Sequence, residues 1–169
     1  MTAPLVIWML GSDSDLPQVE DGFDALKELE IPYEVRILSA HRTPKAVEEV
    51  VSGAKARGTK VMIGVAGGAA HLPGVIASHT TLPVIGVPIV TTMSGGLDSL
   101  LSIVQMPGGI PVATVAAGKS GGRNAALLAA QIIGTSDERV SAALVGMREA
   151  MKTKVLARDK DKGTRLSDD

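Results

Sequence analysis

A histidine and an arginine stand side by side in the segment Ser39-Ala40-His41-Arg42-Thr43-Pro44. An apolar alternating run, residues 33–38, precedes this segment, and a helical pattern follows it. In parallel α/β sheets, such a junction between a strand and a helix is where ligands bind. Histidine gives and takes protons near neutral pH, and arginine binds phosphate through a planar fork of donors. The pair therefore indicates acid–base chemistry on a phosphorylated small molecule.

The two residues that follow this pair have a structural explanation of their own. Thr43 before Pro44 is typical of a helix N-cap followed by the first helical turn, where proline is favoured. That pattern accounts for Thr43 and Pro44 without any function. It leaves His41 and Arg42 unexplained by local structure, so we take His41 as the candidate acid/base.

A second candidate loop, Gly11-Ser12-Asp13-Ser14-Asp15, follows the first apolar run of the chain. A helix N-terminus here would direct free N–H groups outward and favour phosphate. Ser12 could bind a phosphate oxygen, and Asp15 could accept hydrogen bonds from a ribose diol. Alternatively, Ser14 or Asp15 merely caps the helix. The loop is not Gly-x-Gly-x-x-Gly, which argues against a dinucleotide-binding oxidoreductase.

A third loop, Ala66-Gly67-Gly68-Ala69-Ala70-His71-Leu72-Pro73-Gly74, has almost no side-chain bulk before its histidine. Such a loop exposes backbone N–H groups and leaves room for a flat ligand. The other interpretation is a tight turn packed under a helix, which fits the glycines well. It fits His71 less well, although His71 could be a helix-start residue that only shapes the pocket.

Short apolar runs that alternate with helical patterns must position these loops. Nearly continuous Val, Ile, Leu and Met predict strands covered on both faces, at 4–10, 33–39, 60–66, 83–88 and 111–116. Helical spacing predicts helices at 16–29, 44–56, 71–78, 97–105 and 122–133. The alternation predicts an α/β fold with a doubly wound, five-stranded parallel sheet.

A further helix is predicted over about 137–152, because Val140, Leu144 and Met147 form one stripe. The sequence leaves open whether this helix packs on its own subunit or covers a neighbouring one. The charged run that begins at Arg158 is expected to be solvated and frayed. We expect one domain over residues 1–169, with a core at about 4–135, the extra helix at 136–153 and a charged tail at 154–169.

Composition narrows the function classes. A net charge of −1 gives no reason to expect nucleic acid or an acidic membrane surface as a partner. The chain has no cysteine, its start lacks a signal pattern, and no apolar run reaches the roughly 18 residues of a membrane span, so we expect a cytoplasmic protein. His41, His71 and His79 lack metal-site spacing, and we expect no metal.

One motif imitates a phosphate-binding loop. Gly118-Lys119-Ser120 resembles the end of a P-loop, but Ala113 stands where its first glycine would be required. We interpret residues 118–122 as a loop that leads into the helix at Asn124.

Taken in order, several motifs resemble a known family. These motifs are Gly-Ser-x-Ser-Asp at 11–15, Ser-Ala-His-Arg-Thr-Pro at 39–44, Ala-Gly-Gly-Ala-Ala-His-Leu-Pro-Gly at 66–74, Pro-Val-Ile-Gly-Val-Pro at 83–88, Asp-Ser-Leu-Leu-Ser-Ile-Val-Gln-Met-Pro at 98–107 and Asn-Ala-Ala-Leu-Leu-Ala at 124–129. The chain resembles the 5-(carboxyamino)imidazole ribonucleotide mutases, class I of the PurE family, over about residues 4–135. That resemblance implies a flavodoxin-like three-layer αβα sandwich with an extra C-terminal helix.

The resemblance also implies an activity and a site. The activity is an isomerisation in purine biosynthesis, from 5-(carboxyamino)imidazole ribonucleotide to 4-carboxy-5-aminoimidazole ribonucleotide, with no cofactor. His41 would be the acid/base, Asp15 would bind the ribose, and the phosphate would be bound by Ser12, Ser39 and Arg42. The aminoimidazole and the carboxyl group would be framed by Ala66, Gly67, Gly68, Ala69, Ala70, His71 and Leu72.

Assembly and partners follow from the same resemblance. It implies a homo-octamer in which the C-terminal helix reaches across to neighbours. It also implies a ribonucleotide substrate, with a possible transient handover from the upstream ATP-dependent synthetase.

Two other functions compete with the mutase. A class II carboxylase would use free carbon dioxide, and that class carries Lys where this chain has Arg42. A phosphorylated signalling receiver shares the fold and has acids after its first strand, which Asp13 and Asp15 would match. A receiver needs an aspartate at the end of its third strand, where this chain has Ala66-Gly67-Gly68.

Overall fold

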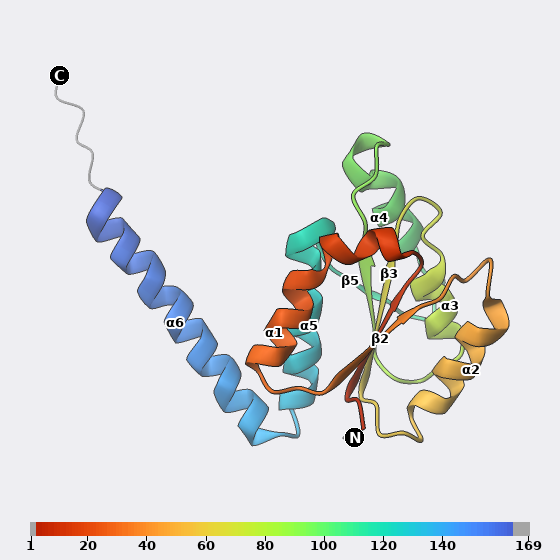
Figure 1. The fold of residues 1–169 in the computed structure, drawn as a ribbon, viewed down its shortest axis with the longest axis horizontal. Helices are drawn as coiled ribbons and strands as arrows, with labels where there is room; N and C mark the ends of the chain where they lie inside the picture. The colour runs from red at the N-terminus through yellow and green to blue at the C-terminus, as the bar shows by residue number, and fades with distance from the viewer. Residues whose placement is uncertain (1–2, 164–169) are drawn as a thin grey trace.

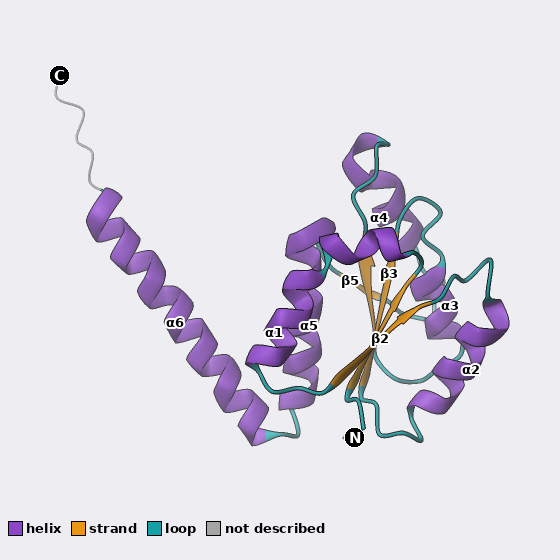
Figure 2. Cartoon of the chain, in the orientation of Figure 1, coloured by secondary structure: helices purple, strands orange, loops and turns teal. Residues whose placement is uncertain are grey.

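The computed structural model describes residues 3–163 and has a parallel sheet at its centre (Figures 1 and 2). The strands are β1 (Val6–Leu10), β2 (Tyr33–Ile37), β3 (Val61–Ala66), β4 (Val84–Pro88) and β5 (Ala113–Thr114). Their order is β2-β1-β3-β4-β5, and all pairs are parallel. The five predicted strands and the flavodoxin-like sandwich are confirmed. This order places the topological switch between β1 and β3, where ligands bind in open α/β sheets.

Helices cover both faces of the sheet. They are α1 (Glu20–Glu28), α2 (Pro44–Ala54), α3 (Leu72–Ser78), α4 (Leu97–Val104), α5 (Gly118–Gly134) and α6 (Glu138–Lys162), with short 3₁₀ helices η1 (Asp13–Gln18) and η2 (Ser94–Gly96). Successive residues of β1 point to opposite faces. Trp8 packs in the cluster under α1 and α5, whereas Ile7 and Met9 pack in the cluster with α2, α3 and α4. No helix among residues 3–163 combines the length and apolar character that a membrane crossing requires.

The amino-terminal boundaries of α1 and α5 differ from the sequence prediction. The helix expected from Leu16 begins as η1, with Pro17 inside it, and becomes α-helical only at Glu20. The loop expected at 118–122 is instead the first turn of α5. Its glycines serve packing: a Cβ on Gly122 would lie 2.7 Å from Cα of Val19, and one on Gly22 would lie 2.5 Å from the carbonyl oxygen of Gly122. Only glycine allows α1 and α5 to approach this closely.

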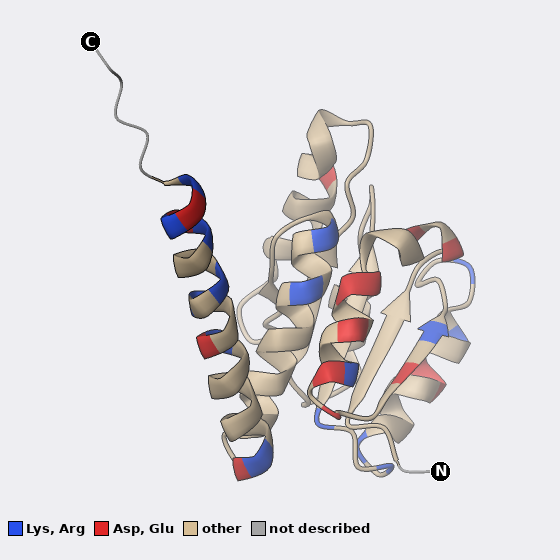
Figure 3. Cartoon of the chain, turned by 60° about the vertical axis from the view of Figure 1, so that its left-hand side comes forward, with Lys and Arg blue, Asp and Glu red and all other residues tan. Residues whose placement is uncertain are grey.

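The C-terminal helix is longer than predicted. Val140 is buried, and Leu144 and Met147 pack against the cluster beneath α1 and α5, so the first turns of α6 lie on their own subunit. The helix then extends away from the body of the molecule (Figure 1), with charged residues spread over its far half (Figure 3). The run at Arg158, expected to be frayed, is exposed and helical as far as Lys162. Residues 164–169 of the predicted tail lie outside the described residues.

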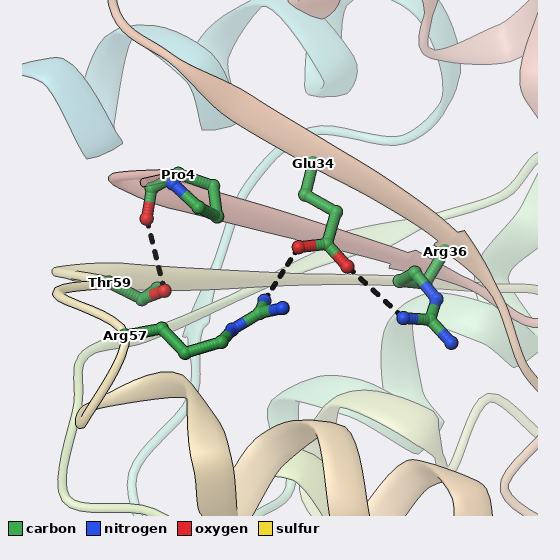
Figure 4. A network of polar contacts seen from close by, with 5 residues as sticks. All are labelled: Pro4, Glu34, Arg36, Arg57 and Thr59. Atoms are coloured by element: carbon green, nitrogen blue, oxygen red, sulfur yellow. Dashed lines mark hydrogen bonds and ion pairs between the residues drawn. The ribbon is translucent and has the colours of Figure 1, made fainter. Parts of the chain in front are cut away.

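Side-chain bonds tie the edge strand β2 to the loop after α2 (Figure 4). Glu34 accepts hydrogen bonds from Arg36 at 3.2 Å and from Arg57 at 2.6 Å, and Thr59 donates to the carbonyl oxygen of Pro4 at 3.1 Å. Partial burial alone would raise the pKa of Glu34, but the hydrogen bonds from the two arginines lower it below its ordinary value. Pro4 and Thr59 lie just before β1 and β3, and none of these five residues lines the cavity that the candidate loops surround.

Candidate active site

The carboxyl ends of four strands surround a cavity of about 550 Å³. It lies at the switch between β1 and β3, because the loops after these strands form two of its walls. The lining residues are Gly11, Ser12, Asp15, Ser39, Ala40, His41, Arg42, Ala66, Gly67, Gly68, Ala69, His71, Leu72, Ile89 and Thr91. The three loops selected from the sequence therefore meet in one hollow.

The loop after β2 is held by its own side chains. The Thr43 hydroxyl donates to the carbonyl oxygen of Ser39 at 3.0 Å and accepts from the Ser39 N–H at 2.9 Å. The Ser39 hydroxyl in turn accepts from the Arg42 N–H at 3.2 Å. Thr43 is the N-cap residue of α2 and Pro44 follows it, as predicted, but the Thr43 side chain closes the loop and does not cap the helix. This closure turns His41 and Arg42 toward the cavity.

Arg42 joins two of the loops. Its guanidinium donates to the carbonyl oxygen of Gly11 at 3.0 Å, which links the loop after β2 to the loop after β1. A second hollow of about 310 Å³ adjoins the first, and Ser12, Ser39 and Arg42 line both. The three predicted phosphate ligands therefore lie together, and an arginine has further N–H donors for an anion.

The residue that caps the helix after β1 is neither Ser14 nor Asp15, the two candidates from the sequence. Ser12 is the N-cap of η1, and its hydroxyl accepts from the Ser14 N–H at 3.3 Å. Asp15 is buried and lines the cavity. Burial raises the pKa of the Asp15 carboxyl, and hydrogen bonds from the Ser14 hydroxyl and the Ser12 backbone only partly oppose that effect. A buried acceptor is thus directed at the place where a ligand would lie.

The two histidines of the site form a pair. His41 Nε2 lies 2.8 Å from His71 Nδ1, and the rings meet edge to face with centroids 5.0 Å apart. One proton lies between these nitrogens, so one ring donates and the other accepts. The sequence had offered His71 only as a residue that frames the ligand or shapes the pocket. Its direct contact with His41 was not foreseen, because the two histidines lie on loops 30 residues apart.

The glycine loop after β3 forms the wall opposite the histidine loop. Gly67 and Ala69 are exposed in the cavity, whereas Ala70 is only 1 % exposed and packs in the cluster with α2 and α3. Ala70 therefore does not line the cavity, because the turn closed by the Ala70 N–H on the carbonyl oxygen of Gly68, at 2.8 Å, directs its methyl group inward; its contact with the substrate stays a prediction. The other eleven predicted site residues line the cavity.

Two lining residues lie outside the three loops selected from the sequence. Ile89 and Thr91 follow β4, and they close the cavity beside the glycine loop. The same rule that selected the ends of the first three strands would have found them, since β4 ends at Pro88 on the same edge of the sheet. Among residues 3–163, no group of three or more His, Asp or Glu side chains is arranged to hold a metal ion. The expectation of a metal-free site stays a prediction.

Comparisons with known proteins agree with this geometry. The family model described as AIR carboxylase matches residues 5–154. An N5-carboxyaminoimidazole ribonucleotide mutase from Bacillus subtilis is 54 % identical over 90 % of this chain and 94 % of that protein. One from Mycobacterium leprae is 52 % identical over 94 % of this chain and 91 % of its own. The crystal structure of Treponema denticola PurE superposes with a TM-score of 0.86 at 31 % identity, covering 95 % of this chain and 99 % of that one. The chain belongs to the AIR carboxylase family.

Proposed function

We propose that His41 is the acid/base by which this enzyme, a mutase of purine biosynthesis, moves the carboxyl group of 5-(carboxyamino)imidazole ribonucleotide to carbon 4 of the ring. The relatives named as mutases, at 54 % and 52 % identity, support the reaction. One observation supports the residue: His41 lies in the same cavity as the bare glycine loop, where a released carboxyl group has room to stay.

The cavity orients a ribonucleotide in one sense. The phosphate binds where Ser12, Ser39 and Arg42 converge, and the ribose hydroxyls donate to Asp15. The ring then extends toward the loop after β3, between His41 and Gly67. In this orientation the phosphate of the substrate meets Arg42, and its flat ring meets the wall with the least side-chain bulk.

The reaction needs one proton, which His41 donates in the first step and regains in the last. Protonated His41 donates to the exocyclic nitrogen; the bond from nitrogen to the carboxyl carbon breaks, its electron pair stays on nitrogen, and carbon dioxide is released. Carbon 4 of the ring, activated by the free amine, then attacks carbon dioxide and forms the new carbon–carbon bond. Neutral His41 takes the proton from carbon 4 and so returns to its protonated form. Confinement of carbon dioxide matters as much as proton transfer, which itself contributes about 10²–10⁴-fold.

The variant His41→Asn tests this role, with His79→Asn as the matched control. His79 ends α3 and does not line the cavity. We expect His41→Asn to bind 4-carboxy-5-aminoimidazole ribonucleotide by calorimetry but to lose interconversion of the isomers, and His79→Asn to keep both. Near-normal turnover by His41→Asn would remove His41 from the mechanism.

A carboxylase that consumes free carbon dioxide is the second candidate, because the family model carries that description. The two activities are separated by supplying either aminoimidazole ribonucleotide with bicarbonate or the carboxyamino substrate. We expect efficient consumption of the carboxyamino substrate alone. Preferential consumption of aminoimidazole ribonucleotide with bicarbonate would assign the carboxylase reaction instead.

We also propose that the enzyme works as a homo-octamer in the cytoplasm, with the far half of α6 on neighbouring subunits. Met151, Val155 and Leu156 of that half are 43 %, 63 % and 53 % exposed in the single chain, which supports burial by another copy. Light scattering behind size exclusion tests the assembly, and a monomer would overturn it. Direct handover of the labile substrate from the upstream synthetase is proposed on the same resemblance, and a trap enzyme for free substrate tests it.

A further inference from the structure

We propose that Ser99 and Ser102 of α4 are positioning residues that fix the peptides around Gly68, so that the N–H of Ala69 is presented to the carboxyl group in transit. This inference rests on the proposed mutase reaction and assigns a role to a helix whose side chains do not line the cavity. Its expected effect is on how often carbon dioxide escapes, and not on how the ribonucleotide binds.

Ser99 joins α4 to the glycine loop. Its side chain is fully buried, and its hydroxyl oxygen accepts a hydrogen bond from the Gly68 N–H at 3.0 Å. Buried hydroxyls are retained in proteins where they have a partner, because an unpaired one is costly. The Ser99 hydroxyl also donates to Oδ1 of Asp98, at 3.5 Å. Because its proton points to Asp98, the Ser99 oxygen is free to accept from the Gly68 N–H.

Ser102, one turn further along α4, holds the other side of Gly68. Its hydroxyl lies 3.2 Å from the carbonyl oxygen of Gly68 and 2.8 Å from that of Asp98, so one proton is shared between two acceptors. The carboxylate of Asp98 accepts from Thr91, a cavity-lining residue after β4, at 2.7 Å. One turn of α4 thus fixes two walls of the cavity from behind.

The direction of the remaining peptide groups follows from planarity. The C=O and N–H of one trans peptide point in opposite directions. Since the carbonyl of Gly68 is directed at α4, the N–H of Ala69 in the same peptide is directed away from it. By the same rule, the Gly67 carbonyl points away from α4, because the Gly68 N–H points to Ser99. Within residues 3–163, the Ala69 N–H donates no hydrogen bond, and Ala69 lines the cavity.

A fixed N–H donor at this wall suits a carboxyl oxygen. Gly68 has φ of +66°, a region in which glycine is free to change conformation, so the loop has no steric lock of its own. Within the loop, the Ala70 N–H donates to the Gly68 carbonyl at 2.8 Å, and the hydroxyls of α4 add a bond on each side of Gly68. When they are absent, the peptide can rotate, the donor is lost and carbon dioxide escapes before carbon 4 attacks it.

The test uses the intact enzyme and the carboxyamino substrate. The quantity measured is the escaped fraction: the share of consumed substrate that appears as aminoimidazole ribonucleotide, after subtraction of spontaneous decarboxylation. It is measured for wild type, Ser99→Ala, Ser102→Ala and Ser102→Thr. Ser78→Ala is the matched control: its hydroxyl also donates to a helix carbonyl, that of Val75 at 2.8 Å, but touches no loop of the site. Melting temperatures and KM are recorded for each variant.

We expect the escaped fraction to rise about 2- to 12-fold in Ser99→Ala, the range that one hydrogen bond supplies, and less in Ser102→Ala. Ser102→Thr, which keeps the hydroxyl, should restore retention, and KM should stay near the wild-type value in all. An unchanged escaped fraction in Ser102→Ala and Ser99→Ala would overturn the inference, and if Ser99→Ala does not fold, Ser102→Ala decides. Failure of the wild type to form the 4-carboxy product would instead overturn the proposed function.

Discussion

Replacing Arg42 by alanine should weaken binding of the ribonucleotide and leave binding of the dephosphorylated ribonucleoside unchanged. One guanidinium N–H is already bonded to the carbonyl oxygen of Gly11 at 3.0 Å, which holds the side chain at the junction of the two hollows. A hydrogen bond to a charged group contributes about 1.5–3 kcal/mol. At about 1.4 kcal/mol for each factor of ten, the expected loss is roughly 12- to 160-fold in Kd. Because Arg42 is exposed, the lower part of this range is expected.

Calorimetry measures this loss when the ribonucleotide and the ribonucleoside are each titrated into wild type and into Arg42→Ala. The change in Kd caused by the variant is then compared between the two ligands. Lys45→Ala is the control for general electrostatics, since Lys45 is an exposed cation three residues along that does not line the cavity. We expect its effect to be small and to vanish with added salt. Equal weakening of ribonucleotide and ribonucleoside by Arg42→Ala, or no weakening of either, would refute the assignment of Arg42 to the phosphate.

Three further changes test other parts of the account. His71→Leu should lower kcat about 12- to 160-fold, the range of one charged hydrogen bond, while His71→Asn, which keeps a hydrogen-bonding group for His41, should lose less; equal kcat values would remove His71 from catalysis. Burial raises the pKa of the Asp15 carboxyl, so the folded state binds its proton more tightly than the unfolded state does. The free energy of unfolding of the enzyme without ligand therefore falls as the pH rises from the ordinary pKa of an aspartate to the raised pKa of Asp15. Asp15→Asn should therefore raise the melting temperature at pH 7 yet weaken ribonucleotide binding, and a lower melting temperature would contradict this. Gly22→Ala places a Cβ 2.5 Å from a carbonyl oxygen of α5 and should cost about 1–3 kcal/mol in urea unfolding, whereas Gly53→Ala, with nothing within 4 Å, should stabilise by up to about 1 kcal/mol.

The sequence was sufficient to predict the sheet, because each strand is indicated by a local run of apolar residues. Nearly continuous apolar runs predicted five parallel strands, and strand ends predicted which loops meet. The position of β5 was found, although only Ala113 and Thr114 pair. Pro111 lacks an N–H, and an edge strand needs few bonds, so the observed strand β5 is shorter than the predicted strand at 111–116.

Features that depend on contacts between distant residues were missed. The glycines at 118–122 suggest a loop by composition. In the folded chain, however, Gly121 and Gly122 allow α5 to pack closely against Ala116 and Val19, and the sequence pattern does not show these contacts. Ala70 and Ala69 are identical in type, and the turn alone decides that one faces the core and the other the cavity. Ser99 and Ser102 belong to the motif at 98–107, but nothing in that motif indicates a hydrogen-bond partner for either of them, since helical serines are commonly exposed. Their partner, Gly68, is 31 and 34 residues away.

The central claim is that the carboxyl group stays in the cavity between His41 and the glycine loop while it changes position. Turnover of substrate labelled with carbon-13 in its carboxyl group, in a large excess of unlabelled bicarbonate, tests this most directly. We expect the 4-carboxy product to retain the label in nearly every molecule, as read by mass spectrometry. A product whose carboxyl carbon has equilibrated with the bicarbonate would contradict it.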